Sequence, residues 1–314
     1  MIVVTGGAGF IGSNLVHALN ARGISDILVV DDLADGHKFT NIAAAAIRDY
    51  EDRDRFLAAV EDERFAGRIE AIFHQGACSD TTEWDGRYLM DVNYRYSRVL
   101  LEFAIARGVP FYYASSAAVY GAAAGFSESP ENERPINLYG YSKTLFDRYV
   151  RRRLPQARSP VAGLRYFNVY GPGEAHKGRM ASVAWHFHRQ IVESGRCRLF
   201  AASGGYGDGE QRRDFVYVDD VVAINLWFLD HPECSGIYNA GSGRSQSFND
   251  VARAVIAHHG RGQIEYVPFP ADLEGSYQNF TEADLSRLRA CGCTLPFRAV
   301  ESGVADYLGR LGDG

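Results

Sequence analysis

Tyr139 and Lys143 stand four positions apart in the stretch LYGYSK, a spacing that places both side chains on one face of a helix. An ammonium beside a phenol favours the phenolate, so this pair predicts a tyrosine whose pKa is lowered toward the working pH. Such a tyrosine can take the proton of an alcohol while the carbon that bears it is oxidised. Ser116, in the stretch YASSAAVYG, can hydrogen-bond the same oxygen. Alone, the spacing is typical of an ordinary helix surface, so its meaning depends on the surrounding elements.

The start of the chain carries a dinucleotide-binding pattern. In VTGGAGFIGS, Gly6, Gly9 and Gly12 follow the apolar run Ile2–Thr5 at the start of a helix predicted over Ile11–Ala21. Glycine allows a tight turn and the close approach of a pyrophosphate, which the amino end of the helix attracts. This pattern is silent on the reaction. We expect five residues of the turn to contact the dinucleotide: Gly6, Gly9, Phe10, Ile11 and Gly12.

Charged residues after the second apolar run leave the choice between NAD and NADP open. Asp31 and Asp32 stand where a carboxylate normally holds the adenosine ribose, which favours NAD. Lys38 and Arg53 follow and are able to pair with a 2′-phosphate, which favours NADP. Under the cofactor we expect further contacts from the stretch HQGACSDTTEW, from one later amide and from the helix pair: Gln75, Gly76, Ala77, Cys78, Ser79, Asn93, Tyr139 and Lys143.

Strand and helix patterns alternate through the first half of the chain. This alternation predicts a doubly wound parallel α/β sheet of the Rossmann type. We expect a dinucleotide-binding domain over 1–168 and a smaller α/β substrate-binding lobe over 169–314, parts of which return to the main domain. The predicted strands are Ile2–Thr5, Ile27–Val30, Ala71–His74, Phe111–Ser115 and Ala162–Phe167, and the helices include Ile11–Ala21, Tyr96–Arg107 and one that begins after Ser247 with Asp250 in its first turn.

Composition excludes several function classes. The 314 residues are 46% hydrophobic and 23% charged, as in soluble globular proteins. A net charge of −6 argues against nucleic-acid or anionic-membrane partners, and no apolar run is long enough to cross a membrane. The first residues run straight into a strand, which leaves no room for a signal peptide. The cysteines have no zinc-site spacing, so we expect no metal and free thiols in a reducing cytoplasm: Cys78, Cys197, Cys234, Cys291 and Cys293.

Several motifs together resemble the extended short-chain dehydrogenase/reductase family, whose members mostly modify nucleotide sugars. These motifs are GGAGFIGS, ASSAAVYG, YGYSK and RYFNVYGP. Longer segments resemble the branch of that family that inverts carbon 6 of an ADP-linked heptose, and this similarity runs along the whole chain. They are HQGACSDTTEWDGRYLMD, HKGRMASVAWH, RRDFVYVDDV and GQIEYVPFP.

The resemblance gives a role to Lys177, which on the residues alone is an exposed loop lysine or a phosphate contact. Inverting an unactivated secondary alcohol requires oxidation to a ketone and return of hydride to the opposite face, and the resemblance implies tightly bound NADP, with NAD less favoured. The oxygen then occupies two positions, so a second acid/base group is useful. Tyr139 would serve one position and Lys177 the other, because a desolvated lysine exchanges a proton near neutrality.

The resemblance also implies a substrate pocket and an assembly. A homo-oligomer, a pentamer in this branch, is implied, acting in the cytoplasm on precursors of the lipopolysaccharide inner core. Asn168 is expected to bind a hydroxyl or the diphosphate, and Arg213 suits a bidentate grip on the diphosphate. The residues expected to face the sugar nucleotide are Asn168, Val169, Arg179, His186, Phe200, Ser203, Arg213 and Tyr277.

Three other functions are weighed against this hypothesis. A UDP-sugar 4-epimerase of the same fold would work with one tyrosine and would not need Lys177. A 4,6-dehydratase is disfavoured, because Ala117 and Ala118 occupy the positions where an acidic pair is wanted. A regulator that senses NADP without turnover would not need Tyr139 and Lys143 in register.

Overall fold

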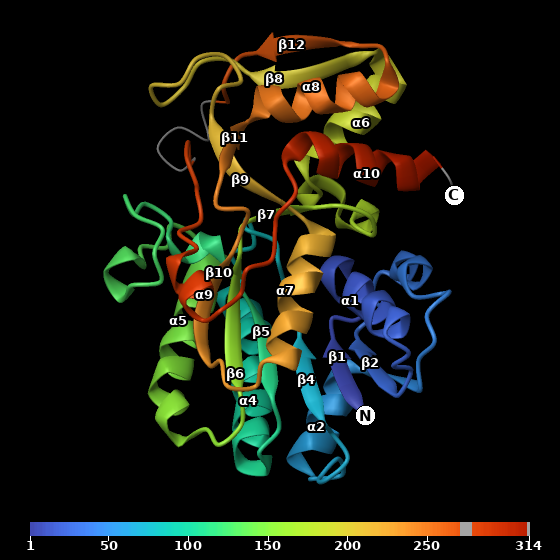
Figure 1. The fold of residues 1–314 in the computed structure, drawn as a ribbon, viewed down its shortest axis with the longest axis vertical. Coiled ribbons are helices and arrows are strands. Elements are labelled where there is room, and N and C mark those ends of the chain that lie inside the picture. Colours follow the sequence, from blue (N-terminus) through green and yellow to red (C-terminus); the bar gives the residue numbers. More distant parts are fainter. Residues whose placement is uncertain (271–277, 313–314) are drawn as a thin grey trace.

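The computed structural model describes residues 1–270 and 278–312. Its centre is a seven-stranded sheet whose neighbouring strands all run parallel, in the order β10-β6-β5-β4-β1-β2-β3. Strand order reverses between β1 and β4, the switch point of a doubly wound sheet, so the predicted Rossmann-type fold is confirmed (Figure 1). The strands are β1 (Ile2–Thr5), β2 (Ile27–Asp31), β3 (Asp49–Asp52), β4 (Ala71–His74), β5 (Phe111–Ser116), β6 (Val161–Tyr166) and β10 (Gly236–Ala240).

Burial of both sheet faces explains why most of these strands are continuously apolar. Along β1, Ile2 and Val4 belong to one apolar cluster, whereas Val3 belongs to a second, because alternate residues of a strand point to opposite faces. The exception is β3, whose sequence DYED is polar and partly exposed at the edge of the sheet beside β2. That polarity is the reason why apolar runs did not predict β3.

Helices cover both faces of the sheet (Figure 1). The helices predicted over Ile11–Ala21 and Tyr96–Arg107 are both confirmed, although the first begins one residue earlier. Helices α1 and α7 contact each other, while α4 contacts both α2 and α5. The bounds are α1 (Phe10–Ala21), α2 (Arg53–Glu61), α3 (Gly86–Leu89), α4 (Tyr96–Arg107), α5 (Leu138–Arg153) and α7 (Val218–Asp230), with the short helices η1 (Gly36–Asn41), η2 (Met90–Arg95), η3 (Ala117–Val119), η4 (Pro130–Asn132) and η5 (Leu154–Gln156).

The second half of the chain adds two small sheets and their helices above the carboxyl edge of the main sheet (Figure 1). The strand β10 and the helix α7 from this half lie with the main sheet. The predicted helix start at Ser247 is confirmed as a capping box with Asp250. The other elements are β7 (Asn168–Tyr170), β8 (Arg196–Phe200), β9 (Arg212–Tyr217), β11 (Ser245–Ser247), β12 (Gln263–Val267), η6 (Ala175–Met180), α6 (Val183–Ser194), α8 (Phe248–His259), α9 (Ser286–Ala290) and α10 (Val300–Gly312).

The cysteines differ in part from expectation. Cys234 and Cys291 form a disulfide, so the prediction of free thiols is wrong for this pair. The two residues lie far apart in sequence but come together because α9 packs beside β10. The thiols of Cys78, Cys197 and Cys293 are free. Across residues 1–270 and 278–312, no helix has the length and apolarity needed to span a lipid bilayer.

Candidate active site

The glycine turn between β1 and α1 leaves room only for backbone. Gly6 has a φ of 65°, and a Cβ there would lie 2.6 Å from the backbone nitrogen of Gly76. A Cβ on Gly12 would lie 2.1 Å from the carbonyl oxygen of Gly6. Gly9 caps α1 without any side-chain hydrogen bond. The amino end of α1 therefore keeps backbone donors for an anion, in a cradle that side chains would fill, and this fits a dinucleotide pyrophosphate.

A charge cluster stands at the carboxyl end of β2. Asp31 is buried and accepts hydrogen bonds from the backbone nitrogen of Ala8, at 2.9 Å, and from Lys38 Nζ, at 2.6 Å. Lys38 also donates to Asp32 at 2.9 Å, and Arg53 Nη1 lies 3.9 Å from Asp32 Oδ2. Burial acts against the Lys38 ammonium, but the two carboxylates outweigh burial and raise its pKa. The four predicted residues are thus brought together.

The segment after β4 lies directly against the glycine turn. Gln75 bonds to the buried side chains of Tyr166 and Asn225. Asn93 is fully buried and exchanges two hydrogen bonds with the backbone of Cys78, at 2.9 and 3.0 Å. Gly76, Ala77 and Cys78 are half-buried, whereas Ser79 is exposed. Four of the five residues predicted in this segment are therefore partly buried beside the turn. The fifth, Ser79, is exposed to solvent.

Tyr139, Ser116 and Lys143 meet where α5 starts beside the end of β5. Tyr139 lies close to Ser116, whose side chain favours the phenolate and acts to lower the tyrosine's pKa. Burial raises the pKa of Tyr139, and the Ser116 contact opposes it only in part, so the predicted lowering is wrong for this structure. Lys143 Nζ donates instead to the carbonyl oxygen of Ala114 at 2.8 Å. Burial lowers the pKa of Lys143 to about 8, opposed by the charge of Asp147.

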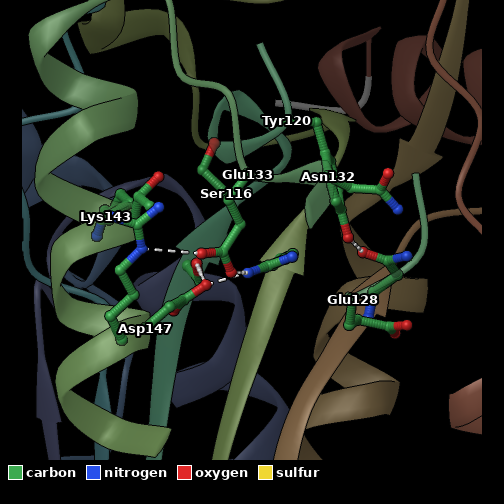
Figure 2. Close-up of polar contacts among 12 residues, drawn as sticks. Ser116, Tyr120, Glu128, Asn132, Glu133, Lys143 and Asp147 are labelled. Atoms are coloured by element: carbon green, nitrogen blue, oxygen red, sulfur yellow. Dashed lines mark hydrogen bonds and ion pairs between the residues drawn. The ribbon is translucent and has the colours of Figure 1, made fainter. Parts of the chain in front are cut away.

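A buried ionic network, which the sequence analysis did not find, links α5 to the neighbouring strand β6. Figure 2 shows Lys143 and Asp147 together, with Ser116 and Glu133 beside them. Asp147 is one helical turn beyond Lys143 and pairs with Arg165 on β6. Arg165 also pairs with Glu133, and neither side chain is exposed. The available signal was the acidic residue four positions after the lysine, which had to share its face of α5.

Lys177 lies in η6, against the glycine turn rather than out in solvent. Its Nζ is 5.4 Å from the centroid of the Phe10 ring, and Phe10 is the first residue of α1. Burial lowers the pKa of Lys177, opposed by the charge of Glu174, so the predicted direction agrees with the structure. The alternative interpretation of Lys177, as an exposed lysine in a loop, does not fit this location.

The residues predicted for substrate occupy more scattered places. Asn168 and Val169 lie in β7 beside β9, the strand that carries the buried Arg213. Arg179 is exposed and pairs with Asp80 at 2.9 Å, so its guanidinium lies against the segment after β4. His186 Nε2 lies 3.3 Å from the carbonyl oxygen of Arg179. Phe200 ends β8, Ser203 accepts a hydrogen bond from Gln211, and Tyr277 falls outside the described residues.

Lysine usage is a second signal that the sequence analysis missed. Only three of the 33 lysine and arginine residues are lysine: Lys38, Lys143 and Lys177. All three lie within the candidate site. Arginine is always charged, whereas a buried lysine can release its proton, as the lowered pKa values of Lys143 and Lys177 indicate. The pKa of Lys38, which pairs with two carboxylates, is raised instead.

A dinucleotide turn at the switch point of a parallel sheet, with serine, tyrosine and lysine at its carboxyl edge, defines a nicotinamide-dependent enzyme class. The model of the NAD dependent epimerase/dehydratase family matches residues 2–241, and the chain belongs to this family. A nicotinamide dinucleotide is accordingly its cofactor class.

Individual relatives narrow the comparison. The chain is 59% identical over 313 residues to an ADP-L-glycero-D-manno-heptose-6-epimerase from Alkalilimnicola ehrlichii, covering 100% of this chain and 98% of the relative. It also resembles the crystal structure of the Helicobacter pylori enzyme of that name, with a TM-score of 0.86, 31% identity and coverage of 99% and 96%. A Thermus thermophilus UDP-glucose 4-epimerase in complex with NAD gives a TM-score of 0.82, 29% identity and coverage of 98% and 97%.

Proposed function

We propose that this chain inverts carbon 6 of ADP-D-glycero-β-D-manno-heptose, giving the L-glycero epimer through a transient 6-ketone, with tightly bound NADP. The observation that carries the proposal is the presence of two separate proton-exchanging groups in the candidate site, Lys177 against the dinucleotide turn and Tyr139 beside the end of β5. Tyr139 comes from α5 and Lys177 from η6. The name of the relative with 59% identity along the whole chain points to the same reaction.

The two groups divide the proton transfers. When bound, the nicotinamide takes hydride from carbon 6 and returns it to the opposite face. Tyr139, held by Ser116, accepts or donates the alcohol proton in one orientation of the substrate, and Lys177 does so in the other. The lowered pKa of Lys177 supports this role, because an acid/base group works best when its pKa lies near the working pH. Lys143, which donates to the Ala114 carbonyl oxygen at the end of β5, would help to hold the dinucleotide.

The cluster at β2 supports NADP over NAD. Asp31 uses both carboxylate oxygens on Ala8, Asp32 and Lys38, so its oxygens are engaged within the protein rather than directed at a ribose. Lys38 and Arg53 balance the charge of the two carboxylates. The cluster therefore holds two cations near the expected ribose position, where they would attract a 2′-phosphate, although Arg53 also pairs with Asp54 at 2.9 Å.

We assign the sugar nucleotide to the surface between η6, β7 and β9. Arg213 would grip the diphosphate, and Asn168 and Val169 would contact the sugar from the neighbouring strand. Arg179, His186, Phe200, Ser203 and Tyr277 complete the proposed pocket. The enzyme is proposed to act in the cytoplasm as a homo-oligomer, a pentamer by resemblance, and light scattering of the purified protein tests the assembly.

Proton NMR of the purified protein with ADP-D-glycero-β-D-manno-heptose tests the function directly. Appearance of the carbon-6 epimer without added cofactor is the expected result, and UDP-glucose should remain unchanged under the same conditions. Lys177→Met should lose most turnover while binding substrate normally. Conversion of UDP-glucose but not of the heptose would assign the chain to the 4-epimerases instead.

A further inference from the structure

A single buried carboxylate, that of Glu174, hydrogen-bonds to both ends of the segment that carries Lys177. Glu174 has no exposed surface. Its Oε1 accepts hydrogen bonds from the backbone nitrogen of Gly171, at 3.2 Å, and from Ser182 Oγ, at 2.7 Å, while Oε2 accepts from the backbone nitrogen of Ser182. Both ends of the 171–182 segment therefore converge on one side chain, with Lys177 between them.

The same segment is fixed to the dinucleotide turn from its other side. Asn14 in α1 donates to the carbonyl oxygen of Pro172 at 2.8 Å. Asn41 donates to the carbonyl oxygens of Gly173, at 3.1 Å, and Ala8, at 3.0 Å. The hydrogen bonds from Asn14 and Asn41, together with those to Glu174, fix the segment that holds Lys177 over the Phe10 ring. The location of Lys177 therefore depends on Glu174 as well as on the glycine turn.

Charge also links the two residues. Burial lowers the pKa of Lys177, and the negative charge of Glu174 acts in the opposite direction. Burial raises the pKa of Glu174, and its bonds from Ser182 and Gly171 and the charge of Lys177 offset that rise only in part. Two other titratable groups face this pair. Tyr307 on α10 interacts with Glu174. His176 interacts electrostatically with Lys38, Lys177 and Asp35.

We propose that Glu174 is the positioning residue of Lys177: its carboxylate anchors both ends of the 171–182 segment, and its negative charge acts on the ammonium without a direct ion pair. This inference rests on the proposed function for its catalytic meaning. A neutral amide of the same shape would keep part of the anchor and remove the charge. Lys177 would then lose its proton more readily, so a smaller fraction would be in the ammonium form that must protonate the substrate oxygen.

Competitive acetylation measures the charge state of Lys177 without any substrate. The holoenzyme is treated with trace acetic anhydride over a series of pH values, and mass spectrometry follows each lysine peptide. Because the chain has only three lysines, Lys38 and Lys143 act as internal references. In Glu174→Gln the labelling midpoint of Lys177 should fall by about one pH unit, a tenfold change in its acid dissociation constant. Glu193→Gln, an exposed position on α6, should leave the midpoint unchanged.

A second variant keeps the test decisive if Glu174→Gln does not fold. Glu174→Asp retains the charge but withdraws it by one methylene, so its midpoint should lie between those of the wild type and the amide. A Lys177 midpoint equal to wild type in whichever of these variants folds, as judged by circular dichroism, overturns the proposal. A shifted midpoint in a protein that does not epimerise the heptose would instead reject the proposed function and leave the pairing of these two residues standing.

Catalysis gives an independent readout. In Glu174→Gln the pH profile of heptose epimerisation should move toward lower pH, with kcat reduced more than KM is raised. Combined with Lys177→Met, the same substitution should cause little further loss, because the group it positions is gone. Full additivity of the two losses would show that Glu174 acts on stability alone and would also overturn the proposal.

Discussion

Arg165 donates from Nε to Asp147 Oδ2 over 2.9 Å, and neither side chain exposes any surface to solvent. The same carboxylate accepts hydrogen bonds from the hydroxyl of Tyr113, at 2.9 Å, and from Ser115 Oγ, at 3.0 Å. The helix that carries Tyr139 and Lys143 is therefore tied to the two strands beside it by one ionic centre. This tie fixes the register between α5 and the end of β5.

Breaking that centre should destabilise the fold. Asp147→Asn leaves Arg165 buried without its full partner, and loss of one member of a buried pair costs about 3–5 kcal/mol of unfolding free energy. Asp91→Asn is the matched control, because Asp91 pairs with Arg95 on the surface and such pairs contribute less than about 1 kcal/mol. Urea unfolding of both variants compares the losses. Equal losses would show that the Asp147 pair has no special weight.

The buried Lys143 ammonium should make stability depend on pH. Burial lowers its pKa from 10.5 to about 8 in the folded protein. The unfolded chain then binds more protons between these two values, so the free energy of unfolding contributed by this group rises with pH across that window.

Replacing Lys143 should reveal this dependence. Lys143→Met is expected to raise the free energy of unfolding near neutral pH, by at most about 3 kcal/mol, because no ammonium has to be buried. The gain should shrink as the pH rises from about 8 to 10.5, where the wild-type lysine is neutral too. Urea unfolding of nucleotide-free protein measures it, with the exposed Arg68→Met as control. A gain that stays constant with pH would contradict this origin.

The sequence predicted the main fold because its strands are buried on both faces. Ile27–Val30 is apolar throughout and Ala71–His74 is apolar up to its last residue, and the structure has strands at both places. The edge strand β3 and the late strand β10 were not predicted. The first is polar, and the second joins the sheet across a long sequence separation that local patterns do not encode.

The site was predictable where its residues are neighbours in sequence. Tyr139 and Lys143, the glycine turn and the Asp31 cluster all depend on local spacing. Asp147 and Glu133 were missed because each pairs with Arg165 on another element. Glu174 was missed although its partners Gly171 and Ser182 are near in sequence, because its role depends on how the 171–182 segment folds back on itself. The lowered pKa expected for Tyr139 failed for the same reason, since the direction of the Lys143 ammonium toward Ala114 is set by tertiary packing.

Tyr139 should be indispensable to turnover although a neighbouring tyrosine is not. Tyr139→Phe removes the group that exchanges the substrate proton, and loss of a positioned acid/base group costs about 10²–10⁴ in rate. Tyr141→Phe, two positions later and exposed, should keep wild-type turnover. NMR gives the rates, and absorbance of the released nucleotide shows that both variants keep their cofactor. Substantial turnover in Tyr139→Phe would assign the proton transfer to another residue.

Lys38 should decide the preference for NADP. In Lys38→Ala the 2′-phosphate loses a charged donor and faces Asp32 without its partner at 2.9 Å. A charge-assisted hydrogen bond contributes about 1.5–3 kcal/mol, so the NADP dissociation constant should rise roughly ten- to a hundredfold. NAD should bind nearly as before, because its ribose lacks that phosphate. Calorimetric titration of nucleotide-free protein measures both, with Arg48→Ala, whose guanidinium pairs with Asp26 on the surface, as control. An equal loss for both nucleotides would mean that Lys38 supports the turn through Asp31 and does not read the phosphate.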